Sequence, residues 1–118
     1  MPSPPLAPDD GPIDLEHLQR MTLGDSLLER EVLAMFISQC DRLMRRLKAR
    51  PTEAAALAHT LKGSARAIGA MRVAACAAAL ELAIRRREDL GATLRELSET
   101  VAEARTAIAA LLERPEAH

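Results

Sequence analysis

Aromatic residues are almost absent from this sequence, and their scarcity limits the kind of core that the chain can build. The 118 residues include one phenylalanine, no tyrosine and no tryptophan, although 48% of them are hydrophobic. The core must therefore consist of Leu, Ala, Ile, Val and Met side chains. Because strands favour β-branched and aromatic residues, this composition favours helices.

An excess of charge of either sign is also missing. The formal net charge is −1, with 28% charged residues. A nucleic-acid-binding domain normally carries a strong basic excess, so the composition argues against nucleic acid as a partner. No apolar run approaches the length of a membrane span, and the start MPSPPLAPDDGP lacks the features of a signal peptide. We therefore expect a cytoplasmic protein with no membrane partner.

Cysteine is scarce as well. Cys40 and Cys76 are too few for a disulfide framework and lack the spacing of a zinc site. We expect two unreactive thiols, buried or half-buried, in a reducing compartment.

The chain divides into a tail, one domain and a short end. Residues 1–12 are rich in Pro, with Gly, Ser and Asp, which predicts a disordered N-terminal tail. Residues 113–118, ending in RPEAH, are predicted to be frayed. Residues 13–112 then form a single domain, long enough to bury a core without disulfides or metals.

Capping residues divide this domain into one short helix and four longer ones. Asp14 is the expected cap of the short helix LEHLQRM. Either Asp25 or Ser26 caps the second helix, and Asp89 the last. The second helix is expected to end before Pro51.

Apolar side chains recur at helical spacing in these segments. On the second helix they are Leu28, Val32, Met35, Phe36, Leu43 and Leu47. Met35 and Phe36 are both expected in the core, with the alternative that an exposed apolar residue near His59 forms part of a docking patch. Short loops place consecutive helices side by side in opposite directions, so we predict an all-α fold. Its architecture is an antiparallel up-down four-helix bundle with a short extra N-terminal helix. Its four seams satisfy one another, so a monomer is expected.

The third helix, which Gly69 is expected to end, carries an arrangement that packing does not require. Its predicted core stripe is Ala54, Ala58, Leu61, Ala65 and Ile68. A different, solvent-directed face carries His59, Lys62 and Arg66. Gly63 follows His59 by one turn, although glycine inside a helix costs about 1 kcal/mol relative to alanine.

This face suits an imidazole that accepts a phosphoryl group. A neutral imidazole has a lone pair that can act as a nucleophile. Lys62 or Arg66 can stabilise the anionic group once it is attached. Gly63, with the small Ala55 and Ser64, leaves room for the active site of a partner. Two plainer interpretations stay open, namely an ordinary solvated face and a glycine that permits close helix packing.

The stretch belongs to a longer pattern. His59-Thr60-Leu61-Lys62-Gly63 is followed by Gly69-Ala70 and then by Leu80-Glu81. Over residues 13–112 the chain resembles the histidine-containing phosphotransfer (HPt) domain of bacterial multistep phosphorelays. The resemblance implies that the histidine accepts the phosphoryl group, the lysine stabilises phosphate and the first glycine admits the partner.

The resemblance also implies which group the chain transfers and which partners it binds. Such a domain takes a phosphoryl group from the aspartyl phosphate of one receiver domain and passes it to the aspartate of another. The expected partners are response-regulator receiver domains and a hybrid histidine kinase. From their positions near His59, rather than from the resemblance, we expect Ala55, Ser64 and Arg66 in the contact. Mg²⁺ belongs to the receiver, so no cofactor or metal of its own is expected, and no independent activity such as ATP hydrolysis.

Two other functions compete with this one. The bundle could dock to receiver domains without accepting phosphate, as a competitor or phosphate sink, although the intact His59 and Lys62 argue against this. A metal-binding bundle would need inward-facing carboxylates with Glu-x-x-His spacing, which the sequence does not offer. It also offers no nucleotide-binding loop and no second candidate base near His59, so an enzyme with its own catalytic machinery finds no support.

Overall fold

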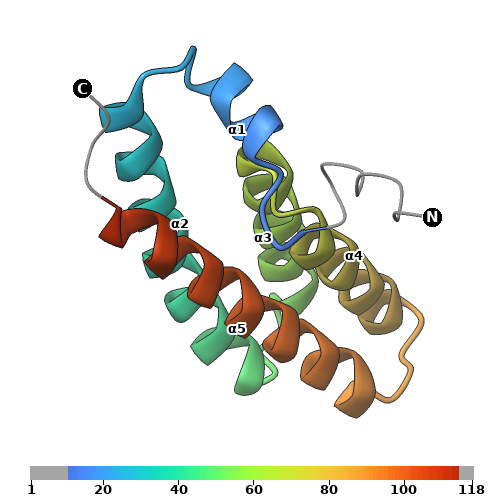
Figure 1. Ribbon diagram of the computed structural model, residues 1–118. Coiled ribbons are helices and arrows are strands. Elements are labelled where there is room, and N and C mark those ends of the chain that lie inside the picture. The colour runs from blue at the N-terminus through green and yellow to red at the C-terminus, as the bar shows by residue number, and fades with distance from the viewer. Residues whose placement is uncertain (1–10, 115–118) are drawn as a thin grey trace, which may run out of the picture.

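The computed structural model describes residues 11–114, in which the chain forms five helices and no strand. The helices are α1 (Leu15–Met21), α2 (Ser26–Lys48), α3 (Ala54–Ile68), α4 (Met71–Arg85) and α5 (Gly91–Glu113) (Figure 1). This confirms the predicted all-α class with one short and four longer helices. Most of the predicted tail at 1–12 and of the predicted frayed end at 113–118 lies outside the described residues, so those boundaries stay predictions. No helix within residues 11–114 is both long and apolar enough to cross a membrane.

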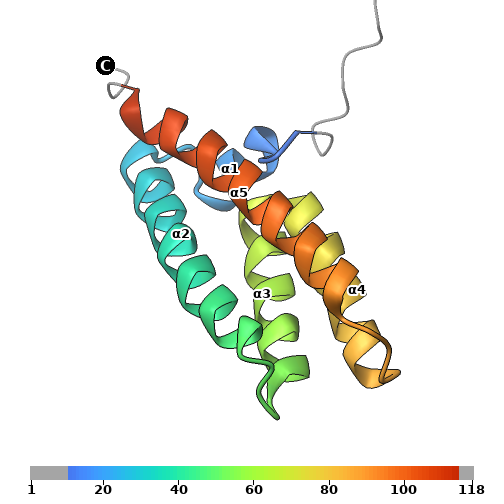
Figure 2. The same cartoon turned by 90° about the horizontal axis from the view of Figure 1, so that it is seen from below.

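The four long helices pack around one core. Each packs against the next along the chain, and α2 also contacts α5, which closes the ring (Figures 1 and 2). The most extensive contact joins α3 to α4, and the short α1 lies on α3. The tightest seam of the bundle is therefore the one that includes the helix with His59.

Aspartates set the start of two helices, as the sequence predicts. Asp14 Oδ1 accepts a hydrogen bond from His17 N at 3.0 Å, and Asp25 Oδ1 accepts one from Leu28 N at 3.0 Å. Asp25, rather than Ser26, is thus the cap of α2. Asp89 lies one residue before the N-cap position of α5, yet its Oδ1 accepts a hydrogen bond from the first helical N–H, that of Gly91, at 3.1 Å.

The core is built from aliphatic side chains, among them several buried alanines. The bulkiest fully buried residues are Leu18, Leu33, Leu47, Leu61, Leu80, Leu97, Ile108 and Val73. The single aromatic residue, Phe36, is 3% exposed. Met35, in contrast, is 70% exposed, so its predicted place in the core is wrong. The buried face of α2 passes through Leu33, Phe36 and Cys40, and one residue of a helix turns the side chain by about 100° away from that face.

Gly69 joins α3 to α4 and also anchors the start of the described chain. It ends α3 in the left-handed conformation, with φ of 87°, and its carbonyl accepts a hydrogen bond from Asp14 N at 2.8 Å. A Cβ at this position would lie 2.8 Å from the carbonyl oxygen of Asp14. Ala70, which follows, is 0% exposed. Glycine at 69 therefore satisfies two separate requirements, the backbone angle and the close approach of the segment before α1.

Gly69→Ala should destabilise the fold more than Gly24→Ala does. Gly24 also has a positive φ, of 74°, but a Cβ there would meet nothing within 4 Å. Gly24→Ala then costs only the left-handed backbone, about 1 kcal/mol, whereas Gly69→Ala adds the clash and should exceed about 2 kcal/mol. Urea denaturation of both variants measures the difference. Equal losses would contradict the proposed contact with Asp14.

Candidate functional site

His59 lies on the outer face of α3, where its side chain is 65% exposed. The neighbouring turns of α3 explain this position, because Ala58 and Leu61 take the buried face and are both 0% exposed. The imidazole is therefore open to a partner while its helix is fixed in the core.

A single carboxylate connects His59 to α4. Glu81 Oε2 lies 3.2 Å from His59 Nδ1, and Oε1 lies 3.4 Å from the same nitrogen. Lys62 Nζ donates to Oε1 at 2.8 Å, and Arg85 Nη2 donates to Oε2 at 3.0 Å. The carboxylate thus gathers groups from two helices at the α3–α4 seam.

The two cations keep Glu81 ionised. Its side chain is only 11% exposed, and burial by itself would favour the neutral acid. The hydrogen bond from Lys62 lowers the pKa most, and the hydrogen bond from Arg85 lowers it further. Together with the nearby charges they outweigh burial, so the pKa of Glu81 falls from 4.5 to about 2.

The ionised carboxylate fixes the tautomer of the imidazole. A carboxylate without a proton can only accept hydrogen bonds, so Nδ1 of His59 must carry the hydrogen. In the neutral ring the lone pair is then on Nε2. In this geometry Nε2 is free to act as a nucleophile, whereas Nδ1 is hydrogen-bonded to Glu81.

Two expectations need correction. No second candidate base was expected near His59, but the Glu81 carboxylate is within hydrogen-bond distance of it. Lys62 was also expected on the solvent face, whereas the Lys62 side chain is only 18% exposed and reaches across to α4. The sequence did contain information that could have predicted the contacts of Glu81 and Lys62 across the two helices. His59 and Glu81 lie at nearly equal distances from the turn at Gly69, and such positions meet when two helices fold back on each other.

Gly63 is exposed, and a Cβ placed on it would meet nothing within 4 Å. Close packing against another helix therefore does not explain this glycine within residues 11–114. Ala55 and Ser64 are half-buried beside this face, and Arg66 is exposed. Arg66 makes none of the hydrogen bonds to Glu81, so the structure does not group it with Lys62.

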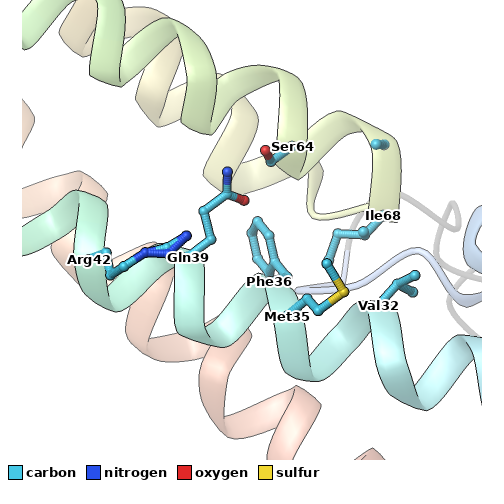
Figure 3. Close-up of a pocket in the computed structure, with 8 residues that line it drawn as sticks. Val32, Met35, Phe36, Gln39, Arg42, Ser64 and Ile68 are labelled. Atoms are coloured by element: carbon cyan, nitrogen blue, oxygen red, sulfur yellow. The ribbon is translucent and has the colours of Figure 1, made fainter.

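A groove between α2 and α3 adjoins this face. It has a volume of about 350 Å³ and is lined by Val32, Met35, Phe36, Gln39, Arg42, Ser64, Ala67 and Ile68. Figure 3 shows the Gln39 side chain extending from α2 toward Ser64 on α3. Ser64, which lines the groove, directly follows Gly63 in α3.

The remaining candidate side chains lie apart from this site. Cys40 is buried, and burial raises the pKa of its thiol to about 11 despite the charge of Arg105. His17 Nε2 lies 3.1 Å from the carbonyl oxygen of Ala67. Within residues 11–114, no three or more His, Cys, Asp and Glu side chains gather in a set that could hold a metal ion. His118 lies outside the described residues.

Within residues 11–114, the bundle presents one exposed histidine, whose Nδ1 is held by a carboxylate that two cations bind. The Hpt domain family model matches residues 31–114, well over half of the chain. The chain belongs to the Hpt domain family, as the resemblance predicted. Membership implies histidine phosphotransfer in phosphorelays and interaction with response-regulator or kinase components. No curated protein matches the sequence at a significant level.

The ion pairs of Glu81 should make stability depend on pH in the acid range. Because the pKa falls from 4.5 to about 2 on folding, the carboxylate stabilises the fold fully above pH 4.5, and this contribution disappears as the pH falls through 2. The free energy of unfolding of Glu81→Gln should lack that part of the pH dependence. Urea denaturation from neutral pH downward measures it, with exposed Glu99→Gln on α5 as the control. Superimposable profiles for wild type and Glu81→Gln would contradict the assigned ion pairs.

Proposed function

We propose that His59 is the phospho-accepting residue and that the chain carries a phosphoryl group between receiver-domain aspartates in a multistep phosphorelay. One observation carries this proposal above the others: the Glu81 carboxylate lies 3.2 Å from Nδ1 of a histidine that is 65% exposed. The other ring nitrogen is then free to react. The ring of helix contacts supports the antiparallel up-down four-helix bundle as the frame of this site.

The transfer step needs only the groups named here and an aspartyl phosphate. The Nε2 lone pair attacks phosphorus, the new P–N bond forms, and the P–O bond to the donor aspartate breaks. The electron pair of that bond leaves with the aspartate as a carboxylate. The imidazole gains positive charge as the bond forms, and the Glu81 carboxylate at Nδ1 stabilises it. Passing the group to a second aspartate reverses these steps.

Lys62 acts here in two ways. Its ammonium, 2.8 Å from Glu81, keeps the carboxylate charged, and the positive charge that Lys62 adds to this cluster favours an anionic phosphoryl group, as the resemblance implies. In-line phosphoryl transfer depends mainly on positioning and charge stabilisation, and a rigid bundle supplies its share of both.

The receiver domain docks on the face around His59. Gly63, which a Cβ would not crowd, lets the partner's active site close over the imidazole. Ala55, Ser64 and Arg66 border the contact, and the exposed Met35 offers an apolar edge. We expect a monomer that meets response-regulator receivers and a hybrid histidine kinase in the cytoplasm. Mg²⁺ enters with the receiver, whose carboxylates hold it.

His59→Gln should abolish phosphoryl acceptance. Glutamine retains a polar side chain but offers no ring nitrogen for a P–N bond. Incubation with a labelled, phosphorylated receiver domain should transfer acid-labile, base-stable label to wild type and none to the variant. A wild-type chain that binds receivers but never takes label would identify the alternative, a docking module without phosphate. Equal labelling of the variant would place the acceptor elsewhere.

Gly63→Leu should separate stability from function. A larger side chain at 63 meets open space and improves helix propensity, so the free energy of unfolding should not fall and should rise by up to about 1 kcal/mol. Phosphoryl transfer should slow by at least about tenfold, since about 1.4 kcal/mol of obstruction at the docking face suffices. Labelling reactions quenched at successive times measure the rate of phosphoryl transfer.

Two matched variants complete this test. Gly63→Ala adds only a methyl group and should slow transfer less than leucine does. Ala79→Leu places the same side chain as Gly63→Leu at an exposed position of α4, two residues before Glu81 and so on another side of that helix. It should leave transfer unchanged. An unimpaired Gly63→Leu would show that access is not why glycine stands at 63.

A further inference from the structure

Two positively charged side chains bind the single negative charge of the Glu81 carboxylate. Lys62 and Arg85 both bind a single carboxylate, and both lie at hydrogen-bond distance from it, 2.8 and 3.0 Å. With His59 neutral, the cluster carries a net positive charge. One cation is sufficient to pair this buried carboxylate, so the second is available for another anion.

The two cations differ in freedom. The Lys62 side chain is 18% exposed, whereas the Arg85 side chain is 61% exposed. Removing Lys62 from Glu81 would leave a poorly solvated carboxylate without its shortest hydrogen bond. Arg85 can leave at lower cost, because its guanidinium already contacts water and Glu81 keeps Lys62.

Arg85 is also close to the reacting ring. Its Nη2 and Nε lie 3.0 and 3.4 Å from Glu81 Oε2, the same oxygen that lies 3.2 Å from His59 Nδ1. The guanidinium of Arg85 and the imidazole of His59 are therefore both within hydrogen-bond distance of the same carboxylate oxygen. Arg66, the other arginine that the sequence points to, lies seven residues after His59, about 10 Å along α3, and does not bind Glu81.

We propose that Arg85 is the phosphoryl-binding cation of the phosphorylated state. When a phosphoryl group is attached to Nε2 of His59, the Arg85 guanidinium moves from Glu81 to the phosphoryl oxygens, and Lys62 stays on Glu81. A guanidinium suits this role because its fork of N–H donors matches two phosphoryl oxygens at once. On phosphorylation, Glu81 then loses its contact with Arg85 but keeps its ion pair with Lys62.

This inference rests on the proposed function, and phosphorus NMR of the phosphorylated protein tests it. Phosphoramidate serves as a small phosphoryl donor that needs no partner protein. A bound cation favours the dianionic phosphoryl group, so the titration midpoint of its phosphorus signal should rise by about half to one pH unit in Arg85→Gln. Lys62→Gln should move the midpoint less. The control Arg86→Gln, at an exposed position at the C-cap of α4 that does not bind Glu81, should leave it at the wild-type value.

The outcomes separate the two proposals. A phosphohistidine signal whose midpoint is unmoved by Arg85→Gln, or moved more by Lys62→Gln, overturns the role of Arg85 and leaves the proposed function intact. The absence of a phosphohistidine signal from wild type, with both phosphoramidate and phosphorylated receivers as donors, overturns the proposed function and the role of Arg85 together. Thermal melting of each unphosphorylated variant shows that the fold is retained. A merely structural contribution of Arg85 would change that melting temperature without moving the phosphorus titration.

Discussion

The carboxylate of Glu81 is the interaction on which the site depends. It stands at the seam of α3 and α4, is 11% exposed, and is bound by Lys62, Arg85 and His59. A buried carboxylate without partners would take up a proton and lose its effect on the imidazole. The two cations prevent this, and so the tautomer of His59 follows from the packing of two helices rather than from the histidine alone.

Two glycines, one inside α3 and one at its C-cap, are present for different reasons. Gly69 is required by the fold, because its φ of 87° and the nearby Asp14 carbonyl exclude a side chain. Gly63 is not required by any contact within the described chain, since a Cβ there would meet nothing within 4 Å. Because Gly63 weakens its helix and no contact within the described chain requires it, the reason for this glycine lies in a partner that approaches the surface.

Periodicity and capping residues were sufficient to predict the helices, the end of α3 at Gly69 and the outward position of His59. They failed for Met35, because a run of apolar neighbours on α2 does not say which one turns outward. They failed again for Lys62 and Glu81. The direction of a long lysine side chain depends on what the adjacent helix offers, and that information lies 19 residues away in the sequence.

The cost of the Glu81 cluster indicates that it serves more than folding. Taking a carboxylate and an ammonium out of water is expensive, and well-packed apolar residues at the same place are often equally or more stabilising. The rest of this core follows that simpler solution, with Leu61, Leu80 and Leu97 each 0% exposed. A charged cluster at one point of such an aliphatic bundle is therefore not explained by stability. It fits the proposed role of His59, in which the imidazole keeps one nitrogen protonated and the other free to bond to phosphorus.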